Sequence, residues 1–217
     1  VSYSARNMNT EGGTIIILRG TDFGGNSSNT VVYYGVPSQY FYKAEFIASQ
    51  KDGTEIFVKS IPAQGGGQAL RDGMGWFVRT ADQNSTWFNV NVTSYHPPII
   101  ESVSLGNNVN FLNTSGGAQI IVKGSNFGKV SDSNISLTYG QFNTSHGTLS
   151  TPIYNGISCE VNIGHTQIIC ISPAGVGKDL AWRVSLGIQK SLIYKSSVRY
   201  EKPVILGISI FEGATRM

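Results

Sequence analysis

The sequence predicts an all-β protein made of two similar β-sandwiches in tandem, and two observations carry this prediction. The glycine-rich stretch Gly12–Gly24 returns as Gly116–Gly128, an offset of 104 residues in a chain of 217. That period is the size of one small domain and is too long for a solenoid repeat. Only 13% of residues are charged, whereas aromatic, β-branched and turn-forming residues are abundant. This composition is typical of β structure and argues against disorder.

The repeat also sets the expected domain boundaries. We expect one domain over residues 1–97 and a second over 98–202. Residues 203–217 would then begin a third domain or form a C-terminal segment, because Pro203-Val204-Ile205 resembles Pro98-Ile99-Ile100. The first copy starts at Val1 without such a proline, so we expect the chain to be part of a longer protein. The stiff Pro97-Pro98 linker predicts a semi-rigid rod.

Short apolar and β-branched runs predict the strands of each copy, and no 3.6-residue stripe competes with them. The runs of the first copy are Thr14–Leu18, Thr30–Tyr34, Glu55–Ser60, Gly75–Thr80 and Trp87–Val92. Those of the second are Gln119–Lys123, Ile135–Tyr139, Thr166–Ser172, Ala181–Gly187 and Ile193–Tyr200. Short strands separated by frequent turns indicate immunoglobulin-like sandwiches.

Specific turns and loops connect these strands. Asp52-Gly53 predicts a tight hairpin, because its turn needs positive φ, and Gly164 takes the matching place in the second copy. We expect loops at Gln39–Lys43, Gly67–Met74 and Gln141–Ile157, where the copies differ in length or sequence. Any specificity of the chain should lie in these segments.

Two cysteines, Cys159 and Cys170, flank the turn at Gly164. We expect them to lie on two arms of one hairpin and to form a disulfide, with two free buried thiols as the alternative. A metal site would need further thiol or imidazole ligands. The matching residues of the first copy are Ala48 and Lys59, so the bridge would stabilise the second copy without being required by the fold.

Asn-x-Ser/Thr sequons predict N-glycosylation, although an asparagine-rich chain also forms such triplets by chance. They occur at Asn26, Asn84, Asn91, Asn113, Asn134 and Asn143. Together with a disulfide, they indicate a secreted or cell-surface protein.

The glycine motif Gly116–Gly128, followed by Tyr139-Gly140 and by Cys170–Gly177, resembles the IPT/TIG domain, an immunoglobulin-like fold of the E-set group. The resemblance is strong over residues 98–202 and looser over 1–97. The chain is most similar to the tiger-type cell-surface proteins of social amoebae. That resemblance implies IPT repeats on a single-pass membrane anchor outside this chain, and a role in cell–cell adhesion and kin recognition.

No residue pattern indicates catalysis, a metal or a cofactor, so we expect a protein that is not an enzyme. The net charge of +3 is too small and too dispersed for nucleic-acid binding. The aromatic cluster Tyr33, Tyr40, Phe41 and Tyr42 is the candidate partner contact, since tyrosine-rich surfaces supply interface hot spots. Core and turn packing is the alternative role for these residues.

Two functions of different classes remain. The first is the extracellular part of an adhesion or recognition receptor that binds a similar protein, of its own or a related type, on another cell. The second is a carbohydrate-binding or accessory module of a secreted glycan-active protein. The tryptophans bear on the second function: we expect Trp76 and Trp182 to lie in the core, whereas Trp87 remains a candidate for stacking on sugars.

Overall fold

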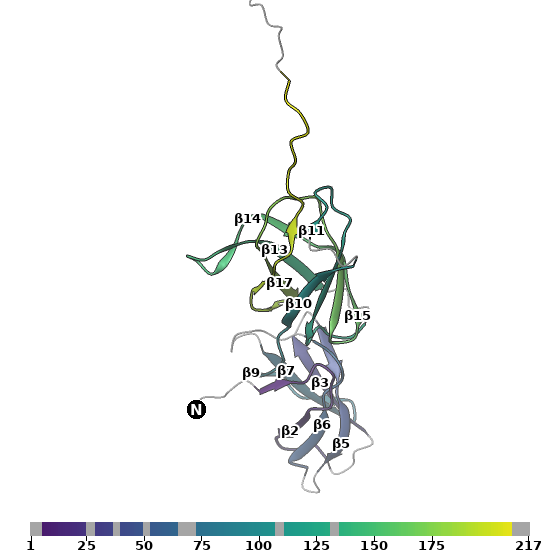
Figure 1. Cartoon of the computed structure of the whole chain (residues 1–217). Coiled ribbons are helices and arrows are strands. Elements are labelled where there is room, and N and C mark those ends of the chain that lie inside the picture. The colour runs from purple at the N-terminus through teal and green to yellow at the C-terminus, as the bar shows by residue number, and fades with distance from the viewer. Residues whose placement is uncertain are drawn as a thin grey trace, which may run out of the picture.

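A computed structural model describes residues 6–24, 29–36, 40–49, 53–64, 73–106, 111–130 and 135–209. These residues form two all-β sandwiches arranged end to end, which confirms the predicted fold class (Figure 1). We call strands β1 to β9 the N-terminal sandwich and strands β10 to β20 the C-terminal sandwich. In both, buried and more exposed residues alternate along the strands, as expected when one face of each sheet covers a core.

In the described part of the chain, the N-terminal sandwich contains a six-stranded and a three-stranded sheet. The larger sheet has the order β1-β9-β7-β3-β4, with β8 paired to β7. Its strands are β1 (Arg6–Met8), β3 (Thr30–Val36), β4 (Tyr40–Lys43), β7 (Met74–Thr80), β8 (Gln83–Asn84) and β9 (Phe88–Tyr95). The smaller sheet has the order β2-β6-β5, formed by β2 (Ile15–Arg19), β5 (Glu45–Ser49) and β6 (Glu55–Lys59).

The C-terminal sandwich repeats this plan over its described residues. One sheet has the order β10-β12-β16-β15, formed by β10 (Ile99–Leu105), β12 (Gln119–Ser125), β15 (Ile157–Ile163) and β16 (Gln167–Ile171). The facing sheet has the order β14-β13-β17-β18, with β19 paired to β17. Its strands are β13 (Ile135–Asn143), β14 (Thr148–Asn155), β17 (Leu180–Leu186), β18 (Gln189–Lys190) and β19 (Tyr194–Lys195). β11 (Phe111–Leu112) and β20 (Arg199–Tyr200) form a parallel pair.

Three predicted segments differ from the observed strands. Most of the expected loop Gln141–Ile157 is a long antiparallel hairpin of β13 and β14, and Pro152 is tolerated there because β14 is an edge strand. The expected loop Gln39–Lys43 largely becomes β4, which pairs with β3. The expected strand Ile193–Tyr200 is divided, because β19 pairs with β17 and β20 pairs with β11. The third expected loop, Gly67–Met74, lies mostly outside the described residues.

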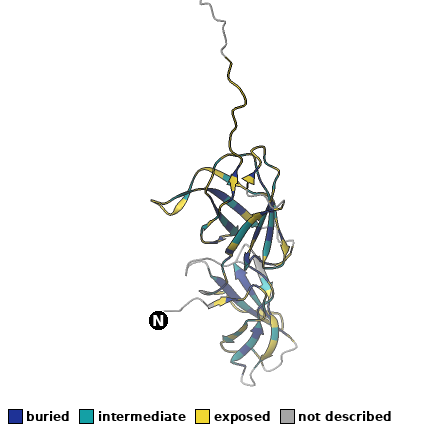
Figure 2. Cartoon of the chain, viewed as in Figure 1, coloured by how far each residue is buried: buried dark blue, intermediate teal, exposed yellow. Residues whose placement is uncertain are grey.

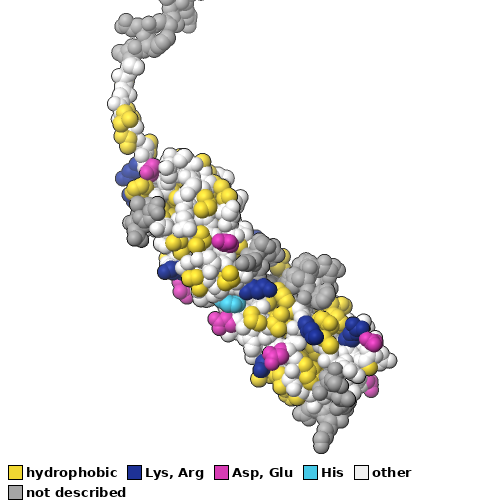
Figure 3. Space-filling view, turned by 90° about the vertical axis from the view of Figure 1, so that its right-hand side faces the viewer, with side chains coloured by type: hydrophobic (Ala, Val, Ile, Leu, Met, Phe, Trp, Pro, Cys, Tyr) yellow, Lys and Arg dark blue, Asp and Glu magenta, His cyan; other side chains and the backbone are white. Residues whose placement is uncertain are grey.

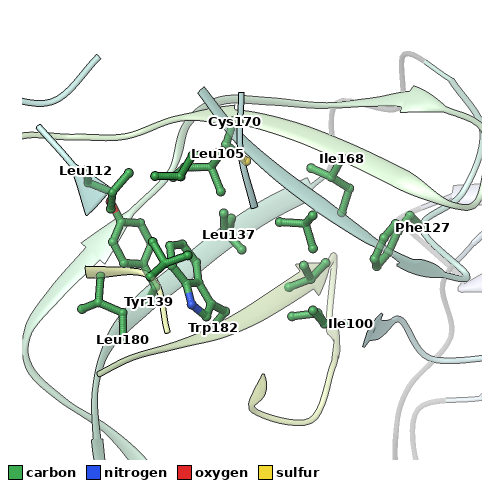
Figure 4. Packing of buried hydrophobic residues seen from close by; sticks show 14 of the residues in the cluster. Ile100, Leu105, Leu112, Phe127, Leu137, Tyr139, Ile168, Cys170, Leu180 and Trp182 are labelled. Atoms are coloured by element: carbon green, nitrogen blue, oxygen red, sulfur yellow. The ribbon is translucent and has the colours of Figure 1, made fainter. Parts of the chain in front are cut away.

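Each sandwich encloses its own hydrophobic core, with no buried residue shared between the two clusters (Figure 2). Tyr34 stacks on Trp76 at 4.5 Å between ring centroids, and Tyr139 stacks on Trp182 at 4.3 Å. Figure 4 shows the second pair against Leu137 and Leu180 at the centre of the C-terminal core. The core role predicted for Trp76 and Trp182 is therefore confirmed.

The repeated glycine and phenylalanine of the sequence motif have a common packing reason. Phe127 is fully buried, and Phe23 packs against the N-terminal core. A Cβ at Gly124 would lie 2.8 Å from the Phe127 ring, and one at Gly20 would lie 2.6 Å from the Phe23 ring. Each glycine therefore leaves room for a phenylalanine ring, and Gly124 also leaves room for the Ile99 carbonyl oxygen, which would collide with the same Cβ.

The strand registers correct three matches between the copies. Ala48 pairs with Phe57, and Glu160 pairs with the equivalent Ile169, so Ala48 stands where Glu160 does and not where Cys159 does. Ile16 pairs with Val58, and the equivalent Ile120 pairs with Cys170, so Val58 and not Lys59 stands where Cys170 does. The expected match to Lys59 is wrong because Ile61 is an extra residue before the shared Pro-Ala. The positive-φ turn residue matching Gly53 (φ 69°) is His165 (φ 61°), not Gly164. The carbonyls of Gly53 and His165 accept equivalent 3.1 Å bonds from the amides of Phe23 and Phe127.

Side-chain hydrogen bonds join the two sandwiches at a region we call the joint. Gln189 Nε2 donates to the Tyr95 carbonyl at 2.8 Å, and this contact is buried. Asn126 Nδ2 donates to the Pro97 carbonyl at 3.0 Å, and Thr10 Oγ1 donates to Asn126 Oδ1 at 3.3 Å. His165 Nδ1 lies 3.1 Å from the same Thr10 hydroxyl. These contacts support the expected semi-rigid arrangement.

The C-terminal end of the described chain leaves the C-terminal sandwich. Residues 201–209 are exposed and run away from the sandwich as an extended segment (Figure 1). The domain boundaries at 97/98 and 202/203, and the assignment of 203–217 to a third domain or a C-terminal segment, stay predictions.

Candidate recognition surfaces

The outer face of the larger N-terminal sheet carries three aromatic side chains. Side chains alternate across a strand, so Tyr34 and Trp76 point into the core while their neighbours Tyr33 and Phe77 point outward. Tyr33 and Phe77 are direct partners on β3 and β7, and their rings stack at 4.9 Å with 15° between planes. Trp87 meets Phe77 edge-on at 4.6 Å. All three are half-buried, and we call them the aromatic face.

A hydrogen-bonded bulge positions Trp87. The Val78 amide donates to Ser85 Oγ at 3.0 Å, and the Ser85 amide donates to the Val78 carbonyl at 2.8 Å. These two bonds hold the segment between β8 and β9 against β7, so Trp87 lies over Phe77. The same pair of bonds recurs between Val184 and Ser191 in the C-terminal sandwich.

The four residues predicted to contact a partner do not lie together. Tyr33 belongs to the aromatic face. Tyr42 packs against the N-terminal core, and its hydroxyl donates to the Gln64 carbonyl at 2.8 Å, so packing accounts for it. The side chains of Tyr40 and Phe41 lie outside the described residues. The prediction missed Phe77, which only the alternation of β7 with buried Trp76 would have placed on the outside.

The equivalent face of the C-terminal sandwich has a different chemistry. Thr138 and Arg183 are partners on β13 and β17, in the register that Tyr33 and Phe77 occupy. Ile193 follows Ser191 at the interval by which Trp87 follows Ser85. The two sandwiches therefore present an aromatic face and a partly basic face at corresponding positions. Figure 3 shows hydrophobic and charged side chains interspersed along one side of both sandwiches.

The predicted disulfide is confirmed. Cys159 and Cys170 are joined at an S–S distance of 2.02 Å, on neighbouring strands β15 and β16. Cys170 is buried in the core, and Cys159 lies in a bulge of β15. Disulfides form and persist in oxidising compartments, so this bond is typical of a secreted or extracellular domain.

Three sequon asparagines lie at described, accessible positions. Asn84 is exposed on β8, Asn113 is exposed in a turn, and Asn143 is half-buried at the start of the β13–β14 turn. Asn113 Oδ1 accepts from the Ser115 amide, and Asn143 Oδ1 accepts from the Ser145 amide, both at 3.0 Å. Each turn engages the side-chain oxygen and leaves the nitrogen, the atom that carries a glycan, outside these bonds.

The remaining sequons cannot be placed in the same way. Asn91 lies in β9 with a side chain outside the described set, and Asn26 and Asn134 lie outside the described residues. Glycosylation at all six positions stays a prediction.

A pair of buried tyrosines lies at the same place in each core. The hydroxyls of Tyr34 and Tyr95 are 2.6 Å apart, and those of Tyr139 and Tyr200 are 2.9 Å apart. Burial raises the pKa of Tyr34, Tyr139 and Tyr200 above the ordinary value, because the phenolate would lose its hydration. The hydroxyls of Tyr95 and Tyr200 donate to the carbonyls of Ile61 and Pro173, so these tyrosine pairs serve the fold.

The described residues contain no group of three or more His, Cys, Asp or Glu side chains placed to hold a metal ion. The same part of the chain has no helix that could span a membrane.

Comparison with known proteins leaves the family open. No protein-family model matches the chain, and a search of curated proteins found no relative. Among solved structures, the chain is similar to the surface glycan-binding protein PbSGBP-B of Prevotella bryantii, with a TM-score of 0.45 and 15% sequence identity. The alignment covers 87% of this chain and 36% of that one, so the chain spans about a third of that protein's length. A likeness of this size carries no inference about ligands.

Proposed function

We propose that this chain is the extracellular part of a cell-surface adhesion or recognition receptor, and that its aromatic face binds a similar protein on another cell. The observation that carries the proposal is the half-buried cluster of Tyr33, Phe77 and Trp87 on the outer face of a sheet. Aromatic residues in such clusters dominate the energetics of protein interfaces. The disulfide and the accessible sequons support an extracellular setting.

The packing of the rings favours a protein partner over a sugar. Tyr33 and Phe77 stack on each other, so each ring covers one face of its neighbour. Trp87 abuts Phe77 edge-on, so the three rings form a contoured cluster and not one flat platform. A sugar stacks on a bare ring face, whereas a protein surface can fit around a contoured cluster.

The experiment is a bead assay with the chain produced in a secretory host. Coated beads are expected to cluster, or to capture a related surface protein. The double variant Tyr33→Ser/Trp87→Ala should lose this binding, since hot-spot truncations cost about 2–4 kcal/mol each. Phe111→Ala is the matched control, because Phe111 is an exposed aromatic residue on the other sandwich. Beads that bind nothing, or a double variant that binds as well as the parent, would refute the proposal.

The second candidate is a carbohydrate-binding or accessory module of a secreted glycan-active protein. Half-buried Trp87 favours it, because an indole ring at a surface can stack on a sugar. A glycan array separates the two functions. Glycan binding that disappears in the Trp87→Ala variant, with no protein partner captured, would replace the adhesion proposal by this one.

A further inference from the structure

The C-terminal sandwich has an open pocket of about 550 Å³ over the outer face of its β13–β17 sheet. This volume lies in the range of small-ligand sites, about 300–1,000 Å³. The pocket lies over the middle of the sheet because β17, which carries Arg183, is flanked by β13 on one side and by β18 and β19 on the other. Its lining residues are Phe142, Gly147, Arg183, Lys190, Ser191, Leu192, Ile193 and Lys195.

Positive charge gathers in this pocket. Arg183, Lys190 and Lys195 line it, and none of the other described residues that line it is acidic. The side chain of Lys195 is held at the pocket by Phe142, whose ring centroid lies 3.9 Å from the lysine Nζ. These positive charges would attract an anion into the pocket.

Arg183 supplies the most specific observation. Its Nε is buried and has no hydrogen-bond partner among the described residues. A buried N–H without a partner is costly, and a guanidinium is satisfied best by a planar or tetrahedral anion that accepts two parallel bonds. Arg183 lines the pocket, so its guanidinium group lies where an anionic ligand would bind.

We propose that this pocket binds a sugar residue that carries a carboxylate or a sulfate. The anionic group accepts hydrogen bonds from Arg183 and lies beside Lys190 and Lys195. The apolar face of the sugar ring packs against Leu192 at the rim, which is 91% exposed. This site is on a different sandwich from the aromatic face and does not rest on the adhesion proposal.

The place of the pocket argues against an acidic peptide as its ligand. Extended peptides bind a sheet by adding a strand to its edge, where unpaired backbone groups are available. Here β17 is already paired on both sides, and the pocket opens over the face of the sheet. A compact ligand recognised by its charge and one apolar face fits this setting better.

The test is a titration followed by NMR or calorimetry, on chain made in a bacterial host so that nearby Asn143 carries no glycan. The probes are N-acetylneuraminic acid, glucuronic acid, galactose 6-sulfate, neutral galactose and a short oligoglutamate. The acidic sugars should bind, and binding should weaken as salt is raised. Comparing the carboxylated sugars with the sulfated sugar shows which anionic group the pocket prefers, and neutral galactose should not bind.

The variants separate this site from general charge effects. Arg183→Lys keeps the positive charge but loses the parallel N–H donors of the guanidinium group, and it should weaken binding of the acidic sugar roughly 10- to 100-fold. Lys195→Gln changes a more exposed residue and should weaken binding without affecting the fold. Lys123→Gln on the opposite sheet removes the same charge and should change nothing. Binding of oligoglutamate alone, no binding of any acidic sugar, or equal losses in Lys123→Gln would overturn the proposal.

Discussion

The joint offers the sharpest test of how the two sandwiches are coupled, through the substitution Gln189→Ala. Gln189 lies on β18 of the C-terminal sandwich, and its Nε2 donates a buried 2.8 Å bond to the carbonyl of Tyr95. The substitution leaves that carbonyl without its side-chain donor. The bond crosses between the sandwiches and belongs to neither core, so the variant should loosen the joint while both sandwiches stay folded.

Two opposing effects set the free-energy cost of Gln189→Ala at the joint. Leaving a buried acceptor unsatisfied costs about 1–3 kcal/mol. Gln189 Oε1, however, is itself buried without a hydrogen-bond partner among the described residues, and the substitution removes that unfavourable group. The lower end of the range therefore applies. A cost of about 1 kcal/mol changes the ratio of docked to undocked joints roughly fivefold.

The assay is double electron–electron resonance between spin labels on unnatural residues at exposed Lys43 and Glu160, one on each sandwich. The parent should give a narrow distance distribution, and Gln189→Ala should broaden it. Gln141→Ala, which changes an exposed glutamine on β13, is the matched control and should leave the distribution narrow. Equal widths in all three proteins would refute the argument that this bond holds the joint.

The other predictions concern stability. Replacing Cys159 and Cys170 by serine should destabilise the C-terminal sandwich by about 2–3 kcal/mol, because the disulfide closes a short loop. Denaturant unfolding under non-reducing conditions would measure the loss of stability, and an unchanged unfolding midpoint would contradict the prediction. Tyr34→Phe should lower the free energy of unfolding more than Tyr139→Phe does, because the Tyr34 hydroxyl also accepts a hydrogen bond from the Ile61 amide at 3.0 Å. Hydrogen exchange in each core would measure the two losses of stability, and equal losses would contradict this prediction. The contribution of Tyr139 to stability should be fully present below the unfolded-state pKa near 10 and be lost at higher pH, because the raised folded-state pKa of Tyr139 keeps its proton on while the unfolded chain loses it. Tyr139→Phe should reduce the alkaline fall of the melting temperature, and an unchanged fall would contradict this prediction.

The sequence was sufficient to predict the fold class because the determinants repeat. Gly20 and Gly124 recur with Phe23 and Phe127, because a Cβ at either glycine would collide with the ring, and at Gly124 also with the Ile99 carbonyl. The disulfide was also predictable, since the two cysteines flank one tight turn. Features fixed by local spacing and by backbone sterics can be predicted from a single chain.

Strand register could not be predicted in the same way. A single extra residue, Ile61, shifted the apparent match from Val58 to Lys59. His165 was missed as a positive-φ residue because such positions favour glycine, and Gly164 stood beside it. The contact of its ring with Thr10 joins residues 155 positions apart, which no local pattern reveals.

The two proposed binding sites lie on the face where the copies differ most clearly. The inward residues Tyr34 and Trp76 are repeated as Tyr139 and Trp182, because both cores need the same stacked pair. The outward-pointing neighbours do not pack in the core, so their identity can differ between the copies. Tyr33 and Phe77 of the N-terminal sandwich correspond to Thr138 and Arg183 of the C-terminal sandwich.

A sheet that kept its fold and changed only its outer face can bind different ligands with the same scaffold. The two faces should then bind their ligands independently of each other. A double variant that combines Trp87→Ala with Lys195→Gln should therefore show each single loss unchanged in its own binding assay, as expected for distant sites that do not share a partner. A loss of acidic-sugar binding caused by Trp87→Ala alone would show instead that the two faces form one site.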